Sequence, residues 1–166
     1  VTNYFDLLND LFISYELQVF SKRAKRQLIK HKKFYFFDTG IFQVLRPRGP
    51  LDIDSEVLGP SLETLVLQEI IAQNNYKKME YDIYFWRTKN HVEVDFILYG
   101  SRGLVAIEVK ASPKVRDSDF QGLNEFLQDY PMAKPYCIYT GSKYYKHGKI
   151  EILPVEQFLK KVSKFI

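Results

Sequence analysis

The chain has a single cysteine, Cys137, among its 166 residues. One cysteine cannot form an intramolecular disulfide or a zinc site made of several thiolates. A disulfide-stabilised secreted fold is therefore excluded, and we expect a protein of a reducing compartment, the cytoplasm. Cys137 falls in a short apolar run, where we interpret it as a small core side chain rather than a nucleophile.

Long hydrophobic runs are also missing. No segment approaches the roughly 18 apolar residues of a membrane span, and the N-terminal residues lack the pattern of a signal peptide, so we expect no membrane partner. The sequence has no GxxxxGK[ST] motif and therefore no phosphate-binding P-loop of its own. Its first residue is Val1, which leads directly into patterned sequence. We therefore expect a fragment of a longer protein.

Aromatic and apolar residues are plentiful. The chain contains 12 Tyr and 13 Phe, and its hydrophobic fraction is 46%. This composition suits a strand-rich α/β or α+β domain with one real core more than it suits a helix bundle. The net charge of +4 permits a nucleic-acid partner without requiring one.

Residues 1–45 combine a helix, two strand-like runs and a basic turn. The spacing of apolar residues predicts the end of a helix over 2–10 and strands over 12–20 and 34–37. This order resembles the last helix and wing of a winged-helix module. The basic turn between the strands either contacts DNA or is a solvated hairpin tip, and both readings stay open. Its candidate phosphate-binding residues are Lys22, Arg23, Lys25 and Arg26.

Residues 46–58 are rich in proline, glycine and charge, which predicts a linker before a second domain over 59–166. Gly59-Pro60-Ser61 then predicts the start of a helix with Ser61 as its N-cap. On this helix Glu63 is surrounded by apolar residues. A carboxylate in such a position is costly unless it is paired or binds a metal.

The sequence from Tyr84 to Lys110 predicts antiparallel strands. If residues 100–103 form the tight turn of a hairpin, residues whose numbers add up to 203 face each other. Asp95 then lies opposite Glu108, and Glu93 lies opposite Lys110. Two carboxylates directly opposite repel each other unless a cation lies between them. The pattern therefore predicts a metal ion between Asp95 and Glu108, with Lys110 at its edge.

Side chains alternate across a strand, so the same register predicts an apolar face and a polar face. The apolar face would hold Val92, Val94, Phe96, Leu98, Val105, Ile107 and Val109. Two simpler interpretations of the polar face stay open. Glu93 and Lys110 form a plain cross-strand salt bridge, or Asp95 bonds Arg87 or the indole of Trp86. Arg87 is itself either part of a packed strand end or a phosphate ligand near the metal.

The predicted order from residue 60 onward is α-β-β-β-α-β, with an aspartate in one inner strand and Glu-x-Lys at the end of the next. This pattern resembles the PD-(D/E)XK nuclease superfamily and its restriction-endonuclease-like fold over about residues 59–141. The resemblance implies that Asp95, Glu108 and Lys110 are the motif residues and that Glu63 completes the site. It further implies Mg²⁺ or Mn²⁺, bound by Asp95, Glu108 and Glu63, as the cofactor.

Four segments give a closer resemblance across almost the whole chain: KFYFFDTGI (33–41), GPSLETLVLQEI (59–70), YFWRTKNHVEVDF (84–96) and AIEVKAS (106–112). They are similar to a C-terminal domain of unknown function found behind an AAA-type ATPase module. This resemblance implies an ATPase domain and a winged-helix region that precede the chain.

Together the two resemblances imply a metal-dependent nuclease, or a nuclease-derived DNA-binding domain, carried behind an ATPase. The main alternative is a catalytically inactive domain that binds DNA or a protein partner and regulates the ATPase. A structural oligomerisation domain is a third. Because members of one fold often differ in chemistry, the fold does not decide among them.

Overall fold

A computed structural model describes residues 2–29, 31–45, 49 and 54–166. It is a mixed α/β structure built on one sheet. The elements in chain order are α1 Thr2–Asp10, β1 Ser14–Val19, β2 Lys33–Phe36, α2 Thr39–Leu45, α3 Asp54–Tyr76, β3 Asp82–Arg87, β4 Glu93–Gly100, β5 Gly103–Lys110, the 3₁₀ turn η1 Asp117–Phe120, α4 Gln121–Asp129, β6 Lys134–Tyr139, β7 Tyr145–His147, β8 Ile150–Pro154, α5 Val155–Lys160 and α6 Val162–Phe165.

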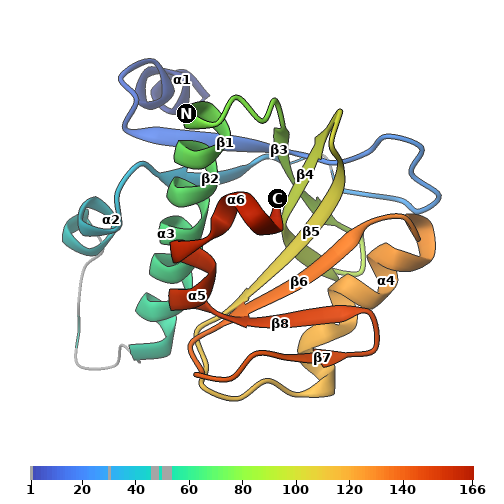
Figure 1. Ribbon diagram of the computed structural model, residues 1–166. Coiled ribbons are helices and arrows are strands. Elements are labelled where there is room, and N and C mark those ends of the chain that lie inside the picture. Colours follow the sequence, from blue (N-terminus) through green and yellow to red (C-terminus); the bar gives the residue numbers. More distant parts are fainter. Residues whose placement is uncertain (1, 30, 46–48, 50–53) are drawn as a thin grey trace.

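The sheet has eight strands in the order β2-β1-β3-β4-β5-β6-β8-β7 (Figure 1). The centre is the antiparallel meander β3-β4-β5, to which β6 and then β8 add in parallel. At the other side β1 pairs in parallel with β3, and β2 pairs with β1 at the edge. The N-terminal hairpin therefore extends the main sheet.

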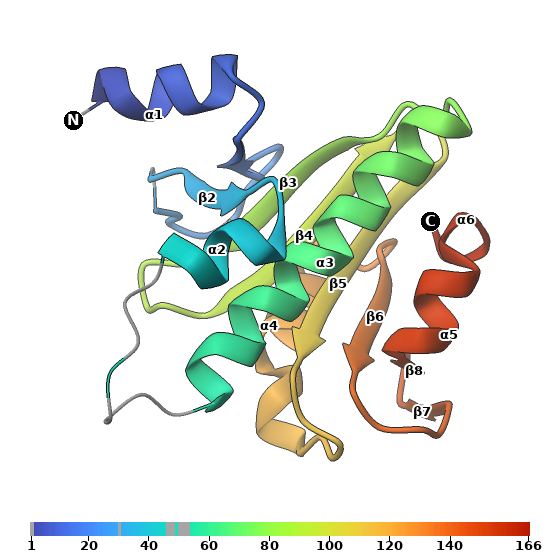
Figure 2. The ribbon, with the colours of Figure 1, turned by 90° about the vertical axis from the view of Figure 1, so that its left-hand side faces the viewer.

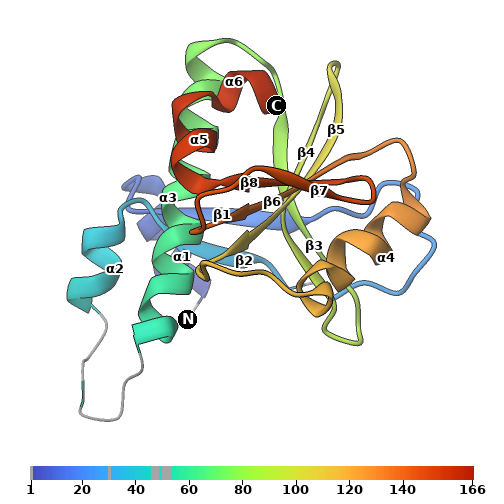
Figure 3. The ribbon, with the colours of Figure 1, turned by 60° about the horizontal axis from the view of Figure 1, so that its bottom comes forward.

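Helices cover both faces of the sheet. Figure 3 shows α3, α5 and α6 on one side and α4 on the other, and Figure 2 shows α3 crossing in front of β3, β4 and β5. Each face buries its own apolar cluster. The α3 cluster includes Val66, Ile70, Phe96 and Ile107, whereas the α4 cluster includes Trp86. Strands covered on both faces are continuously apolar, which explains the buried middle of β4 and β5.

The predicted register of the central hairpin is confirmed where β4 and β5 form a ladder. Phe96 faces Ile107 and Gly100 faces Gly103, so the numbers of paired residues add up to 203. The ladder ends at Phe96 and Ile107, so the predicted cross-strand pairs Asp95–Glu108 and Glu93–Lys110 lie beyond it. The predicted salt bridge between Glu93 and Lys110 is wrong, because Glu93 pairs with Lys33 and Arg87, and Lys110 pairs with Glu108.

A β-bulge in β4 overturns the predicted division of the two faces. Tyr84 faces Ile97 and Trp86 faces Val94, so one residue of β3 lies opposite two residues of β4. The extra residue reverses the alternation of side chains. Val94 therefore joins the α4 cluster with Val92 packed against it, while Phe96 and Leu98 stay in the α3 cluster as predicted.

The start of α3 also differs from the prediction. The helix begins at Asp54, so Pro60 lies inside it and Ser61 is not its N-cap. The rest of the predicted linker falls largely on 46–48 and 50–53, which lie outside the described residues. The α-β-β-β-α-β order predicted from residue 60 is present as α3-β3-β4-β5-α4-β6.

In the described part of the chain, no helix combines the length and the apolar character that crossing a bilayer requires.

Candidate functional site

A lysine lies among three carboxylates where β2, α3 and β4 meet. The Nζ of Lys33 is 2.6 Å from Oε1 of Glu93, 3.1 Å from Oδ1 of Asp95 and 3.1 Å from Oε2 of Glu63. Lys33 is the first residue of β2. We call Lys33, Glu63, Glu93 and Asp95 the acidic centre. Lys33 thus supplies a cation to Asp95, one of the two carboxylates between which the sequence predicts a cation, whereas Glu108 pairs with Lys110.

Tyr35 fixes the same strand against α3. Side chains alternate along a strand, so Tyr35 lies on the same face of β2 as Lys33. Its hydroxyl donates a hydrogen bond of 2.9 Å to Oε2 of Glu63, and its ring is buried in the α3 cluster. Glu63 therefore accepts from both β2 residues. As the sequence suggested, its apolar surroundings are compensated by polar partners.

The pKa values of the acidic centre follow from burial and mutual charge. Burial alone would lower the pKa of Lys33, but the negative charges of Asp95, Glu63 and Glu93 outweigh it and hold the pKa above that of a free lysine. Burial, followed by the charge of Asp95, raises the pKa of Glu63, and Lys33 and Tyr35 oppose that rise. Lys33 is therefore fully charged at neutral pH.

Asp95 links the acidic centre to the neighbouring strand β5. It is buried, at 7% exposure, and it sits in the bulge of β4. Its Oδ1 contacts Lys33, and its Oδ2 accepts a hydrogen bond of 2.9 Å from the backbone N–H of Val109. The interpretations in which Asp95 bonds Arg87 or Trp86 are wrong, since Arg87 contacts Glu93 and His91 instead and the Trp86 indole N–H has no partner.

Glu108 and Lys110 form a separate pair at the end of β5. The Lys110 Nζ lies 2.7 Å from Oε1 of Glu108. By alternation Glu108 lies on the face of Leu104 and Ala106, which belong to the α4 cluster, whereas Glu63 comes from the helix on the other face. The sheet thus separates Glu108 from Glu63. The two residues lie on opposite faces of the sheet, near the same ends of its central strands.

The second carboxylate oxygen of Glu108, Oε2, is buried and has no hydrogen-bond partner. Burial, and then the charge of Asp95, raise the pKa of Glu108 well above its ordinary value, although Lys110 opposes them. Glu108 therefore feels the charge of Asp95 without any direct bond to it. A buried, unpartnered carboxylate oxygen is costly and often marks a functional position.

Replacing Glu108 with glutamine is expected to stabilise the protein at neutral pH, by on the order of 1 kcal/mol. A carboxyl whose pKa is raised by folding favours the native state below its unfolded pKa and loses that contribution as the pH rises. Glutamine imitates the neutral acid at every pH. Urea unfolding in EDTA should show a Glu108→Gln advantage that is absent near about pH 4 and grows towards pH 8.

The exposed Glu156 provides the control for this measurement, because Glu156→Gln replaces a carboxylate at the surface rather than a buried one and should show a smaller growth of the advantage towards pH 8 than Glu108→Gln. A constant difference between wild type and Glu108→Gln over the same range would contradict the expectation and show that folding does not shift the titration of Glu108.

The arrangement of these side chains bears on the predicted metal. Among the described residues, no three or more His, Cys, Asp or Glu side chains are arranged as a group that could hold a metal ion. The donor chemistry is nevertheless suitable, because carboxylate oxygens are the ligands that Mg²⁺ and Mn²⁺ prefer. The unpartnered Oε2 of Glu108 is a free acceptor, while Lys33 takes the oxygens of Asp95 and Glu63.

The candidate phosphate-binding residues lie elsewhere and differ in availability. Arg26 makes ion pairs with Glu125 at 2.8 Å and Asp129 at 3.0 Å, so its charge is compensated within the chain. Lys22 lies over the ring of Tyr99, with its Nζ 4.0 Å from the ring centroid. Arg23 and Lys25 are exposed.

Arg87, the remaining candidate, contacts the acidic centre from its border. Its Nε is 3.4 Å from Oε2 of Glu93, and its Nη2 is 3.0 Å from Nδ1 of His91. Arg87 is therefore the candidate phosphate ligand nearest to the carboxylates. Cys137, interpreted from the sequence as a core residue, is buried, and burial raises its pKa to about 12.

Sequence reasoning missed Lys33 and Tyr35, because Lys33 was counted with the basic turn. A signal was present in the sequence. In the aromatic run KFYF, Lys33 and Tyr35 alternate with Phe34 and Phe36, so a lysine shares a strand face with a buried ring. The sequence does not show which carboxylates would contact that face.

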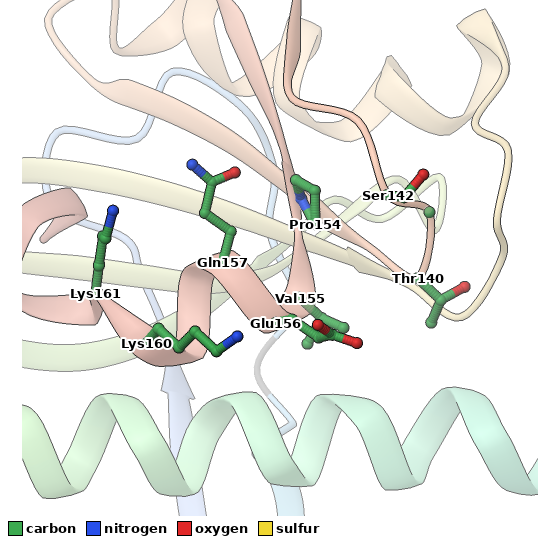
Figure 4. Close-up of a pocket in the computed structure, with 9 residues that line it drawn as sticks. Thr140, Ser142, Pro154, Val155, Glu156, Gln157, Lys160 and Lys161 are labelled. Atoms are coloured by element: carbon green, nitrogen blue, oxygen red, sulfur yellow. The ribbon is translucent and has the colours of Figure 1, made fainter.

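The parallel strands β5, β6 and β8 all finish on the side of the sheet where the site lies. Lys110 is in register with Tyr139, which is in register with Pro154. Beyond these ends a cavity of about 370 Å³ lies between the segment after β6 and α5 (Figure 4). Its polar lining includes Ser142 and Lys160 but none of the predicted site residues.

A second cavity, of about 480 Å³, lies closer to Lys110. It is lined by Ala111 and Pro113, directly after β5, and by residues of α2 and α3 that include Ser61. The Oγ of Ser61 is buried without a partner. Open space therefore adjoins the end of the strand that carries Glu108 and Lys110.

Comparison with family models places this site within two matched segments. A domain of unknown function, DUF4143, matches residues 58–158, which is more than half of the chain. The chain belongs to the DUF4143 family. The match covers most of the stretch in which the sequence resembles the ATPase-associated domain, and that resemblance is confirmed at the level of the family. Glu63, Glu93, Asp95, Glu108 and Lys110 all lie inside the DUF4143 match.

A second domain of unknown function, DUF8612, matches residues 1–55 and contains Lys33 and Tyr35. The acidic centre of this DUF4143 chain is therefore built from both matched segments. No curated protein and no solved structure matches the chain.

Proposed function

We propose that this DUF4143 chain is a nuclease-derived domain that binds a nucleic acid, DNA in the first instance, and cleaves a phosphodiester with the help of a divalent ion. The observation that supports the proposal is the buried Oε2 of Glu108. It has no hydrogen-bond partner, and it lies at the strand end where Lys110 is its neighbour and Asp95 is close enough to shift its pKa. Such a group has an acceptor site left for a ligand.

The element order adds support. The run α3-β3-β4-β5-α4-β6 has the α-β-β-β-α-β order for which the sequence resembles the PD-(D/E)XK nucleases. Asp95, Glu108 and Lys110 stand at the positions of that motif. The cavity next to Ala111 and Pro113 leaves room for a substrate strand at the end of β5.

Asp95 and Glu108 are the residues that would hold Mg²⁺ or Mn²⁺ at the end of β5, and Glu63, which the sheet separates from Glu108, would join them only at the strand ends, where the two faces of the sheet meet. When bound, such an ion supplies positive charge to a phosphate oxygen and lowers the pKa of a bound water. Lys110, held by Glu108 at 2.7 Å, would donate to an oxygen of the phosphodiester as its negative charge increases. Arg87 at the border of the acidic centre would neutralise the adjacent phosphate.

One observation favours a second candidate function. Lys33 already neutralises part of the carboxylate cluster, as expected of a domain that has kept the fold and lost the chemistry. In that case the chain binds DNA or a protein partner and regulates the ATPase module that the family resemblance implies.

Incubation of the chain with supercoiled, branched and single-stranded DNA in Mg²⁺ or Mn²⁺ tests the proposal. We expect cleavage by the wild type and a loss of about 10³-fold or more in Asp95→Asn, because the variant lacks a charged ligand. Asp82→Asn is the matched control, since Asp82 is exposed and pairs with Tyr99 near the turn of the hairpin. It should cleave like the wild type.

If the chain binds DNA but cleaves it neither in Mg²⁺ nor in Mn²⁺, the nuclease proposal is overturned and the interaction domain is favoured. Equal cleavage by Lys110→Ala and the wild type would remove Lys110 from the mechanism.

A further inference from the structure

We propose that Lys33 is an internal cation that competes with a divalent ion for the acidic centre, so that a metal binds Asp95 only when the Lys33 ammonium leaves. The inference rests on the proposed function, because it concerns the same carboxylates. It adds what controls the access of metal to them.

The contacts of Asp95 make the two cations mutually exclusive. Its Oδ1 is 3.1 Å from the Lys33 Nζ, and its Oδ2 accepts the backbone N–H of Val109. Both oxygens are therefore in use. A metal that binds Asp95 must take Oδ1 from Lys33, since the Val109 N–H belongs to the backbone of the neighbouring strand and cannot swing away.

Glu63 leads to the same conclusion. Its Oε2 accepts from the Tyr35 hydroxyl and from Lys33. A metal with Asp95 and Glu63 as ligands would lie between them, on the side where the ammonium now is. Two cations cannot share that position, because at such short separations like charges repel each other strongly in a poorly solvated site.

The charge of the acidic centre favours the exchange. Glu63, Glu93 and Asp95 contribute three carboxylates around one ammonium, and Arg87 reaches only Glu93. The centre therefore keeps an excess of negative charge and attracts further cations. A doubly charged ion would compensate it more completely than Lys33 does.

The exchange requires no movement of the backbone. The side chain of Lys33 is 24% exposed, so its ammonium can turn out into solvent about its own flexible stem. The strand stays in place meanwhile, because Tyr35 is buried at 5% exposure in the α3 cluster. The backbone of Lys33 is thus held in place, whereas its ammonium group can move.

The two partners of this competition come from different parts of the chain. Lys33 lies in the DUF8612 match, and the carboxylates lie in the DUF4143 match. The first segment therefore controls metal access to the second.

Calorimetric titration with Mn²⁺ tests the proposal on the full chain. We expect Lys33→Met to bind Mn²⁺ about tenfold more tightly than the wild type or better. We expect Lys33→Gln, which also removes the ammonium but keeps an N–H donor for the carboxylates, to show a gain of the same sign. Adding Asp95→Asn to either variant should abolish the gain. Affinity for Mn²⁺ that is equal to or weaker than that of the wild type would overturn the proposal.

If Lys33→Met does not fold, Lys33→Gln decides, since tighter binding supports the competition and equal or weaker binding contradicts it. The outcomes separate this inference from the proposed function. Tight Asp95-dependent Mn²⁺ binding by the variants without any DNA cleavage supports the competition and overturns the nuclease. Cleavage by the wild type, combined with no gain in Mn²⁺ affinity, supports the nuclease and overturns the competition.

Discussion

Replacing Lys33 with methionine is expected to lower the free energy of unfolding by about 3 kcal/mol at neutral pH. Methionine keeps most of the aliphatic stem and removes only the charge. The carboxylates of Glu63, Glu93 and Asp95 would then face one another without the ammonium that lies within 3.1 Å of each. Removing one partner from a buried ionic cluster is costly because the remaining charges stay desolvated.

The pH dependence identifies the cause. In the Lys33→Met protein the crowded carboxylates would titrate at a higher pH in the native state than in the unfolded chain. The penalty should therefore be nearly absent once they are protonated, at about pH 4, and increase as the pH rises. Urea unfolding of both proteins in EDTA at pH values from about 4 to 8 would measure this difference.

Lys32 offers a matched control at the adjacent position. Its side chain is 51% exposed and pairs with Glu16 at the surface, so Lys32→Met should leave the stability nearly unchanged at every pH. If Lys33→Met and Lys32→Met unfold at the same urea concentration, Lys33 does not hold the acidic centre together.

The second large effect is expected at Gly122, the second residue of α4. A Cβ built there would lie 1.9 Å from the carbonyl oxygen of Glu93 and 3.3 Å from Cγ2 of Val94. Neither the helix nor the strand can yield that much without moving apart. We therefore expect Gly122→Ala to lower the free energy of unfolding by about 3 kcal/mol, at the upper end of overpacking costs.

The direction of this prediction is opposite to that of helix propensity, by which alanine is better than glycine by about 1 kcal/mol. Asn124→Ala on the exposed side of the same helix is the control, and it should be neutral or slightly stabilising. Chemical denaturation of the two variants decides. A Gly122→Ala protein as stable as wild type would show that α4 does not need its close approach to β4. Because the contact is with Glu93, we also expect the backbone NMR chemical shifts of residues in the acidic centre to change in Gly122→Ala and not in Asn124→Ala.

Much of the strand pattern could be predicted because it is local. The turn at residues 100–103 determines which residues of β4 and β5 face each other, and the observed pairs follow it. The order of elements likewise follows from apolar spacing along the chain. These features depend on neighbours in sequence, where the pattern is strongest.

The bulge in β4 and the true start of α3 could not be predicted in the same way. A bulge depends on how β3 and β4 pair, and the residues around Asp95 do not predict it. The sequence prediction places Pro60 just before the helix, with Ser61 as the N-cap, because proline is unfavourable inside a helix. In the structure six helical residues precede Pro60, beginning at Asp54.

The site was predicted in part. The sequence predicted a cation between Asp95 and Glu108 and a partner or metal for Glu63, and the structure brings Asp95 and Glu63 to Lys33 but leaves Glu108 paired with Lys110. It did not identify that cation. Lys33 reaches Asp95 across 62 positions of sequence, and the contact exists only because β1 pairs in parallel with β3. Sequence periodicity carries no information about such a distant pairing.

That same pairing has a consequence for the order in which the protein folds. The meander of β3, β4 and β5 closes through short connections, whereas joining β1 to β3 must close the long loop that contains α2 and α3. Loop closure of this length is slow relative to hairpin formation. We therefore expect the carboxylates of β4 to be gathered before Lys33 arrives, so that during this interval Glu93 has Arg87 of β3 as a partner while Asp95 depends on the cations of the solvent.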